Sequence, residues 1–346
     1  MYLLESMTST ILGLDIGGAN LKAATNTGAA ASVPFALWKQ PENLPAALGE
    51  LIARFPDADE LAVTMTGELC DCFETKREGV RQIVNAVMNV SRSRPIRVWS
   101  TDGVFLNSNE AKEHYLKVAA ANWHALATFA GGYTPRGVTL LIDIGSTTTD
   151  LIPILDGLPW SHGKTDTTRM QLGELVYTGV RRTPATTLLG SLAAAEFFAT
   201  VHDAYLLLGT VPEDFDDTDT ADGRPSSKQN AHARLSRMIG GDPTLTSEDS
   251  TRGLAKLMVE RQRDLLSSKL LALLPRLREM RRAAIHPRRY AVVSGSGEFL
   301  ARLLLKEKEL CDFFDEVLTL TDRLGPERSA AAAAYAVAML AAERPL

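Results

Sequence analysis

The chain has 346 residues, which at roughly 150 residues per domain predicts about two domains. A net charge of −5, with 45% hydrophobic and 23% charged residues, is typical of a folded globular protein and argues against nucleic-acid binding. Three cysteines are too few for a disulfide framework, no apolar stretch is long enough to span a bilayer, and Met1–Ser9 lacks the pattern of a signal peptide. We therefore expect a cytoplasmic enzyme with small-molecule substrates and neither nucleic-acid nor membrane partners.

An internal repeat is the most informative feature of the sequence. Residues 11–24 and 140–152 each contain an apolar run that ends in aspartate, then a glycine turn, then a second strand-like run. Aligning Asp15 with Asp143 also aligns the Ile-Gly pair that follows each of them, at an offset of 128 residues. Two copies at this separation predict two related domains, each beginning with the same hairpin.

The rest of the chain alternates between helical and strand-like patterns. Apolar residues have helical spacing in 44–55 and 80–87, and strand-like runs follow at 61–66 and 96–100. Alternation of this kind predicts an α/β architecture. The later expected elements are helical segments from 254 to 273, a strand at 290–294, a glycine loop at 295–297, a helix at 298–305 and an alanine-rich helix at 329–340.

Residues 209–252 differ in composition from the alternating segments. Six acidic residues lie between Glu213 and Asp222, without the glycine and terminal glutamate of a calcium loop. We interpret this segment as a solvated, mobile insertion. The expected domains are residues 8–135, completed by a C-terminal helix at 328–342, and residues 136–327, which include the glycine loop and the insertion.

Both hairpins are candidate phosphate-binding loops. Glycine turns offer backbone N–H groups and neighbouring hydroxyls to phosphate oxygens, and an aspartate at a strand end can hold Mg²⁺. Lys22 takes the position that Asp150 has in the second hairpin, where it either contacts phosphate or is a surface lysine. The expected metal ligands are Asp15, Asp143 and Asp150. The expected phosphate-binding residues are Gly17, Gly18, Asn20, Lys22, Gly145, Ser146, Thr147, Thr148, Thr149, Gly295, Ser296 and Gly297.

The two hairpins resemble the phosphate loops of the sugar kinase, heat-shock 70 and actin superfamily. In that comparison Ser294–Gly297 corresponds to the adenosine loop and Ala330–Leu340 to the connecting helix. The resemblance covers most of the chain and implies two ribonuclease-H-like α/β domains with a cleft between them. It does not specify the reaction, because one fold hosts many chemistries.

Four segments, 15–22, 63–73, 143–150 and 173–184, are together similar to the hydantoinase/oxoprolinase-like family linked to tetrahydromethanopterin and methanofuran one-carbon metabolism. This resemblance implies a transferase that condenses an aminomethylfuran-methyl diphosphate with γ-glutamyltyramine, or a similar phenol, and releases diphosphate. The strand-end aspartates beside a diphosphate predict Mg²⁺ as the cofactor. We expect no requirement for ATP, because the alkyl diphosphate already carries its leaving group. The alternative functions are an ATP-dependent small-molecule kinase, an ATP-driven hydantoinase/oxoprolinase-like hydrolase, or a nucleotide-binding scaffold. The sequence does not specify the oligomeric state, and a homodimer is one option.

The implied reaction needs ionisable residues near the phenol substrate. A phenol with a pKa near 10 needs a base or a cationic neighbour at neutral pH. The expected catalytic residues are Glu68, Asp71, Asp166 and Lys22, with helix capping or pairing with arginine as the alternative role of each carboxylate. The expected substrate-binding residues are Thr64, Thr66, Gly67, Glu174, Tyr177, Arg181 and Arg182, the two arginines serving phosphate, a carboxylate or a structural salt bridge.

Overall fold

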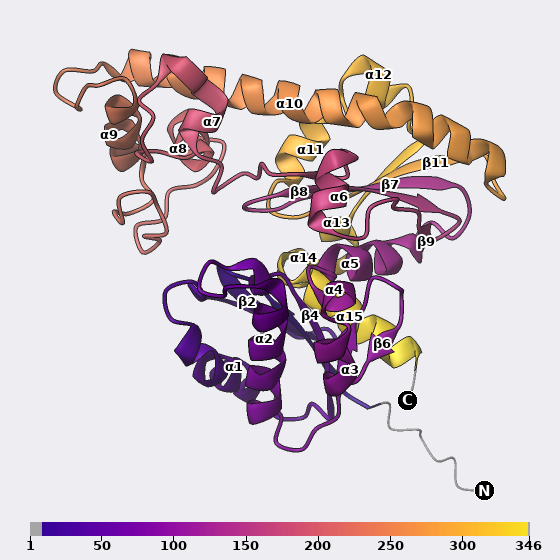
Figure 1. Cartoon of the computed structure of the whole chain (residues 1–346). Helices are drawn as coiled ribbons and strands as arrows, with labels where there is room; N and C mark the ends of the chain where they lie inside the picture. Colours follow the sequence, from indigo (N-terminus) through magenta and orange to yellow (C-terminus); the bar gives the residue numbers. More distant parts are fainter. Residues whose placement is uncertain (1–8, 345–346) are drawn as a thin grey trace, which may run out of the picture.

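The computed structural model describes residues 9–344. The segment Met1–Ser9, where we expect no signal peptide, therefore lies almost wholly outside the described residues. Two mixed β-sheets organise the described chain, and Figure 1 shows them one above the other with helices between them. Among residues 9–344, no helix combines the length and apolar character needed to cross a lipid bilayer.

The first sheet contains β1 (Ile11–Ile16), β2 (Asn20–Thr25), β3 (Ala30–Pro34), β4 (Glu60–Met65), β5 (Ile96–Trp99) and β6 (Phe105–Leu106). Its spatial order is β3-β2-β1-β4-β5-β6. Strand β1 pairs antiparallel with β2 and parallel with β4, and β4 pairs parallel with β5. Every residue of β1 is buried, which is the continuous apolar pattern of a strand covered on both faces.

The second sheet contains β7 (Val138–Ile144), β8 (Thr149–Leu155), β9 (Leu158–Pro159), β10 (Leu175–Val176), β11 (Arg289–Ser294) and β12 (Glu316–Thr319). Its main path is β10-β8-β7-β11-β12, with β9 paired to β8. Strand β7 pairs antiparallel with β8 and parallel with β11, and β11 pairs parallel with β12. The order and the directions repeat those of the first sheet, so both halves have the expected ribonuclease-H-like arrangement and the sequence repeat is a structural repeat.

The helices of the first half are α1 (Leu44–Ala53), α2 (Lys76–Val90), α3 (Ser108–Glu113), α4 (Tyr115–Val118) and α5 (Asn122–Gly131). Helices α1 and α2 cover one face of the first sheet, where Leu48 and Val84 pack with Leu14 and Val63. Thr75 begins α2 by accepting a hydrogen bond from the backbone N–H of Glu78, which is ordinary N-cap chemistry.

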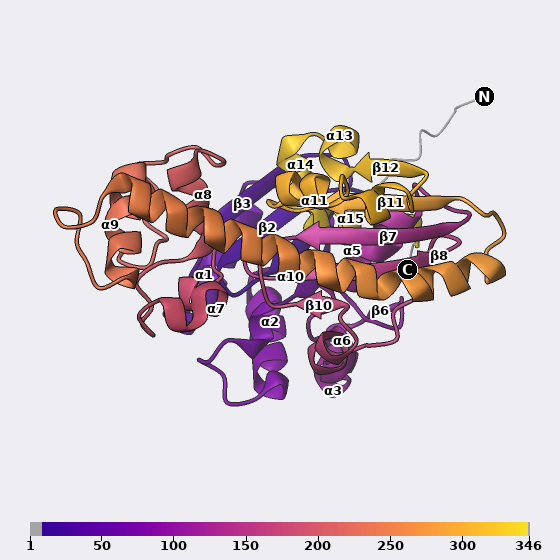
Figure 2. The ribbon, with the colours of Figure 1, turned by 90° about the horizontal axis from the view of Figure 1, so that it is seen from above.

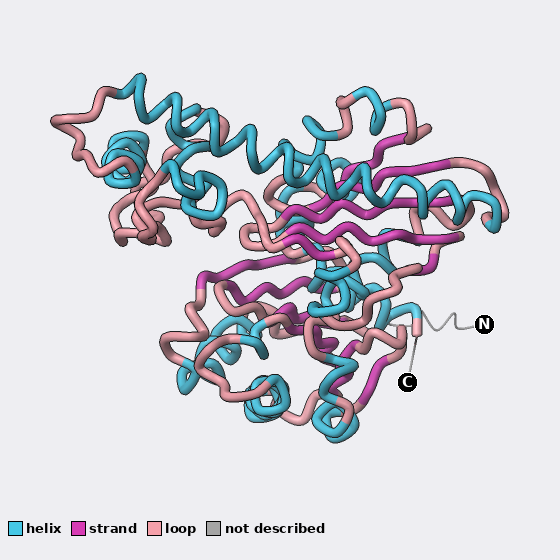
Figure 3. Tube along the Cα trace, turned by 45° about the horizontal axis from the view of Figure 1, so that its top comes forward, coloured by secondary structure: helices cyan, strands magenta, loops and turns pink. Residues whose placement is uncertain are grey.

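Helices lie between the two sheets, which Figure 3 shows as two groups of magenta strands with cyan helical turns between them. Helix α15 (Ala332–Glu343) packs on β1, β2, β4 and α5, and its alanines let it come very close to the sheet. Gly13 of β1 makes this approach possible, because a side chain there would collide with the carbonyl of Ala334. The apolar cluster of this layer joins Leu126 of α5 with Leu141 of the second sheet, so one core connects both halves.

The remaining helices are α6 (Asp166–Gln171), α7 (Ala185–Leu189), α8 (Val201–Leu208), α9 (Lys228–Met238), α10 (Glu248–Ala283), α11 (Glu298–Leu304), α12 (Lys308–Cys311), α13 (Leu320–Leu324) and α14 (Pro326–Ala330). Helix α10 has 36 residues and runs across the second sheet to reach α8 and α9, as Figure 2 shows.

The acidic segment is more structured than the sequence interpretation suggests. It contains α9, and Asp214 and Ser226 form a β-bridge. The Arg234 guanidinium, which is fully buried, donates to Asp203 at 2.7 Å and to Asp222 at 2.9 Å. A buried arginine needs carboxylate partners, so Asp222 of the acidic segment forms a structural ion pair and is not simply solvated. Mobility of this segment stays a prediction.

Candidate functional site

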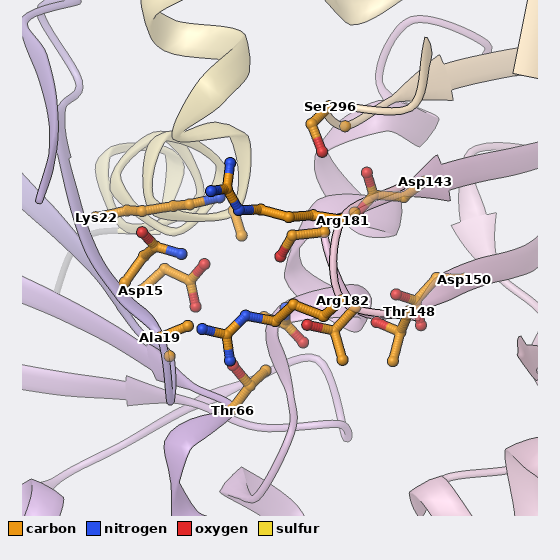
Figure 4. A pocket seen from close by; sticks show the side chains of 18 of the residues that line it. Asp15, Ala19, Lys22, Thr66, Asp143, Thr148, Asp150, Arg181, Arg182 and Ser296 are labelled. Atoms are coloured by element: carbon orange, nitrogen blue, oxygen red, sulfur yellow. The ribbon is translucent and has the colours of Figure 1, made fainter. Parts of the chain in front are cut away.

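A cavity of about 790 Å³ lies between the two halves and is lined by both repeated hairpins (Figure 4). Strand β11, helices α5, α6, α14 and α15 and the segment 177–182 also contribute to its wall. Most of the expected phosphate and metal residues line it. They are Asp15, Gly17, Gly18, Asn20, Lys22, Asp143, Gly145, Ser146, Thr147, Thr148, Asp150, Gly295 and Ser296.

The two hairpin turns are built alike. The backbone N–H of Gly17 donates to the carbonyl of Asn20 at 3.0 Å, and that of Gly145 donates to the carbonyl of Thr148 at 2.8 Å. The cavity therefore receives a short turn with polar backbone and side-chain groups from each half. Turns of this kind are suited to binding anions.

The parallel neighbours of the two hairpins are also equivalent. Thr64 lies beside Asp15 in the β1–β4 pair, and Ser294 lies beside Asp143 in the β7–β11 pair. The sequences Thr-Met-Thr-Gly at 64–67 and Ser-Gly-Ser-Gly at 294–297 thus occupy matching positions at strand ends. Sequence reasoning missed this second repeat, although the pattern of hydroxyl, any residue, hydroxyl and glycine was its signal.

The two strand-end aspartates are held in unusual electrostatic surroundings. Burial raises the pKa of Asp15, although Lys22 opposes the shift, and the Asp15 Oδ1 atom has no hydrogen-bond partner among the described residues. Burial also raises the pKa of Asp143 to about 6, with the charge of Asp150 adding to the shift and Lys22 opposing it. Each carboxylate would be stabilised by a cation that entered the cavity.

Magnesium fits this site only in company with a phosphate ligand. Within residues 9–344, no group of three or more histidine, cysteine, aspartate or glutamate side chains is arranged to hold a metal ion. Mg²⁺ often takes one or two carboxylates and completes its shell with phosphate oxygens and water. The free Asp15 oxygen and the Asp143 carboxylate match that requirement.

Asp150 has a protein cation instead. It accepts a hydrogen bond from Arg169, whose buried guanidinium also lies 4.2 Å from the centre of the Trp123 ring. Burial raises the pKa of Asp150 and the charge of Arg169 opposes this rise. This ion pair argues against our expectation that Asp150 binds a metal, and Arg169 is a cavity residue that sequence reasoning missed.

Glu68 is buried next to the cavity wall. Glu68 is 1% exposed, and neither of its carboxyl oxygens has a hydrogen-bond partner among the described residues. Burial raises its pKa to about 7, while the charge of Lys76 opposes the rise. Its chain neighbours Thr66 and Leu69 line the cavity, although Glu68 itself does not. A carboxyl group of this pKa is divided between its acid and base forms near neutral pH.

Asp166 and Tyr177 both line the cavity. Asp166 pairs with Lys76 at 3.3 Å, an ion pair that joins the two halves of the chain. Burial raises the pKa of Tyr177, and the negative charges of Asp166 and Glu68 add to the shift. Glu68 and Asp166 therefore form an acidic cluster beside Tyr177, and Asp166 and Tyr177 bring it to the cavity.

Arg181 and Arg182 line the cavity and are paired with the acidic segment. Arg181 donates to Asp217 at 2.7 Å, and Arg182 donates to Asp219 at 3.0 Å. The guanidinium of Arg182 also lies 4.8 Å from the centre of the Trp38 ring, across the cavity in the first half. The two arginines are thus available to an anionic ligand that displaces the aspartates, and Trp38 is another residue that sequence reasoning missed.

Several expected site residues lie outside the cavity lining. Glu174 is buried, accepts from Ser161 and from the backbone N–H of His162, and pairs with Arg276, so these contacts favour a structural role, and substrate binding by Glu174 stays a prediction. Asp71 is exposed on the surface. The others are buried in the strand ends and turns that support the cavity, namely Thr64, Gly67, Thr149 and Gly297.

His202 is a further lining residue without a sequence signal. Its Nε2 atom lies 2.6 Å from the Ser226 hydroxyl, and burial lowers its pKa to about 4. It is therefore neutral at pH 7 and is held by the segment that precedes α9.

Comparison with known proteins identifies the family of this chain. The hydantoinase/oxoprolinase family profile matches residues 59–344. A (4-{4-[2-(γ-L-glutamylamino)ethyl]phenoxymethyl}furan-2-yl)methanamine synthase from Methanocaldococcus jannaschii is 31% identical, over 96% of this chain and 98% of that protein. A synthase of the same name from Methanococcus vannielii is 30% identical over 58% of this chain and 89% of its own length.

A solved structure supports the fold. The nucleotide-free structure of an acetone carboxylase aligns with 95% of this chain and 70% of that chain, with a TM-score of 0.55 and 12% identity. At this identity the likeness concerns the fold and carries nothing about the reaction.

Proposed function

This chain belongs to the hydantoinase/oxoprolinase family, and we propose from its near full-length similarity to a named synthase that it catalyses the same condensation. The substrates are an aminomethylfuran-methyl diphosphate and γ-glutamyltyramine, and the product is (4-{4-[2-(γ-L-glutamylamino)ethyl]phenoxymethyl}furan-2-yl)methanamine. The protein is thus a transferase of an alkyl group in methanofuran biosynthesis. The 31% identity over 96% of the chain is the observation that carries this proposal.

The reaction makes one bond and breaks one bond. The phenol oxygen attacks the CH₂ carbon of the furan substrate, the bond between this carbon and the diphosphate oxygen breaks, and the phenol proton passes to a carboxylate. The protein must bind the departing diphosphate, orient the phenol and keep water from the activated carbon.

We assign diphosphate to the two hairpin turns. The backbone and hydroxyl groups of Ser146 and Thr148, with the ammonium group of Lys22, line the cavity where negative charge grows on the leaving group. Asp15 and Asp143 are the residues that would hold Mg²⁺, which when bound would neutralise part of the diphosphate charge.

We assign the proton acceptor to the acidic cluster of Glu68 and Asp166. Glu68 has the pKa of about 7 that a general base needs at neutral pH, and Asp166 lies beside it at the cavity. Asp166 is paired with Lys76, whereas both oxygens of Glu68 lack partners among the described residues. Glu68, which lies behind the lining residues Thr66 and Leu69, is therefore our first choice as base.

The experiment is a reaction with both substrates and Mg²⁺ but without nucleotide. Mass spectrometry should detect diphosphate and the ether product in equal amounts. Product that forms only with ATP, with ADP released in step, would replace this proposal with an ATP-driven reaction.

A further inference from the structure

The second phosphate loop, residues 145–148, is hydrogen-bonded through its backbone to the segment 178–183. The backbone N–H groups of Arg181 and Arg182 both donate to the carbonyl of Ser146, at 3.0 and 2.8 Å, and the N–H of Val180 donates to the carbonyl of Gly145 at 3.0 Å. The shape of the loop 145–148 is therefore coupled to the shape of this segment.

The contact is too close for any side chain at its centre. A Cβ atom on Gly179 would lie 2.5 Å from the carbonyl oxygen of Gly145 and 2.5 Å from the backbone nitrogen of Thr147. The two backbones are thus in direct contact, so a displacement of one displaces the other. The same segment carries Arg181 and Arg182 into the cavity.

Helix α10 reaches this segment through one buried side chain. Gln262 is fully buried, and its amide nitrogen donates to the Thr178 hydroxyl at 2.8 Å and to the carbonyl of Gly179 at 2.8 Å. Its amide oxygen accepts from the Tyr205 hydroxyl of α8 at 2.6 Å. A glutamine in an apolar helix interface needs such partners, because an unpaired buried amide is costly.

The hydroxyl of Thr183 completes the bracing from within the segment. It accepts from the backbone N–H of Gly179 at 2.9 Å and donates to the carbonyl of Gly179 at 2.8 Å. Thr149, which follows the loop, donates to the carbonyl of Thr178 at 2.7 Å. The network therefore runs from α10 through 178–183 to both ends of the second phosphate loop.

We infer that Gln262 is a positioning residue for diphosphate, acting through Thr178 and Gly179 on the phosphate loop and on Arg181 and Arg182. This inference rests on the proposed function, because it takes diphosphate as the ligand of that loop. Gln262 does not line the cavity, and its effect comes from holding donors in place before the ligand arrives.

The test replaces Gln262 with methionine, which keeps the length of the side chain and removes its hydrogen bonds. Gln262→Met should weaken the binding of inorganic diphosphate with Mg²⁺ by roughly tenfold in calorimetry, the equivalent of about one hydrogen bond. The KM for the furan diphosphate should rise equally, and the KM for the phenol should not change.

Tyr205→Phe is the matched control. It leaves the Gln262 oxygen buried without its donor and lowers stability, but both donor bonds of Gln262 to the segment remain. Its diphosphate affinity should stay within about twofold of the wild type, since the bracing bonds are untouched. Equal diphosphate affinity in Gln262→Met and Tyr205→Phe, at an equal loss of thermal stability, would overturn the inference.

A second pair of variants tests the network without touching α10. Thr183→Val should weaken diphosphate binding, and Thr183→Ser, which keeps the hydroxyl, should restore it. Hydrogen exchange of the amides at 145–149 should accelerate in Gln262→Met even without ligand, and unchanged exchange would also contradict the inference. Turnover by the wild type separates the two proposals. No turnover by the wild type would reject the proposed function. An active wild type, together with a Gln262→Met variant of unchanged diphosphate affinity, would reject only the positioning role.

Discussion

Lys22 and Asp150 occupy the same position in the two repeated hairpins, since Lys22 lies across β1–β2 from Asp15 and Asp150 lies across β7–β8 from Asp143. One scaffold therefore presents a cation in the first half and a carboxylate in the second. Arg169 pairs with the Asp150 carboxylate and offsets its charge. The positive charge of Lys22 opposes the rise in the pKa of Asp15 and of Asp143, and it can also act on a ligand in the cavity. The repeat is thus symmetric in backbone and asymmetric in charge.

The first prediction concerns this asymmetry. Lys22→Gln should weaken diphosphate binding roughly ten- to hundredfold, because a charged hydrogen bond contributes about 1.5–3 kcal/mol. Calorimetry with inorganic diphosphate measures the effect. Lys256→Gln, which changes an exposed lysine on α10, is the control for the loss of one charge. Equal affinities in the two variants would show that Lys22 is a surface lysine.

The second prediction concerns Mg²⁺. Asp15→Asn and Asp143→Asn should each reduce the dependence of diphosphate binding on Mg²⁺, because each removes one candidate ligand of the metal. Titration of diphosphate with and without Mg²⁺ gives this dependence. Asp57→Asn, at an exposed position, should behave as the wild type. Undiminished Mg²⁺-dependent binding in both cavity variants would remove the phosphate-loop assignment.

The third prediction concerns Glu68 in catalysis. Glu68→Gln should lower kcat by about 10²–10⁴-fold, the usual contribution of a general base, with little loss of folded protein. The wild-type rate should rise with pH through about 7 as Glu68 loses its proton, and this rise should be absent in the variant. Normal turnover per folded molecule, with a collapse of thermal stability, would make Glu68 structural.

The fourth prediction uses the same residue to test its burial. The pKa of Glu68 rises from 4.5 to about 7 on folding, so the wild type loses stability as pH increases across this interval. Glu68→Gln has no charge to bury, so it should match the wild type below pH 4.5 and become more stable by on the order of 3 kcal/mol above pH 7. Denaturant unfolding at several pH values measures the difference. A constant difference from pH 4 to pH 8 would contradict the raised pKa.

The fifth prediction concerns the aspartates that hold the cavity arginines. Replacing Asp217 and Asp219 together by asparagine should strengthen diphosphate binding several-fold, because the ligand no longer competes with carboxylates for Arg181 and Arg182. The gain should shrink at high salt, where charge interactions are screened. Weaker binding in the double variant would instead show that the aspartates hold the arginines in their binding positions.

Local patterns in the sequence were sufficient for the fold class and for the two hairpins. Each hairpin is encoded by a continuous apolar run, an aspartate and a glycine turn, and each of these features acts within about ten residues. The expected helices at 80–87 and 298–305 correspond to α2 and α11 for the same reason. The acidic segment was harder to interpret, because its partners Arg181 and Arg182 lie more than thirty residues earlier in the chain.

By itself the sequence determined the repeated hairpins, the α/β alternation and the identity of the residues at the strand ends, because these depend on short-range periodicity and on the conformational freedom of glycine. Only the tertiary structure decided which of the chemically suitable residues share the cavity. In the structure Arg169 forms an ion pair with Asp150, and the Arg182 guanidinium lies over the Trp38 ring. Glu174 lies outside the cavity lining and forms an ion pair with Arg276. Pairings of this kind depend on how two sheets and a long helix pack, and their partners are separated by up to 144 residues, from Trp38 to Arg182, so no local pattern in the chain records them.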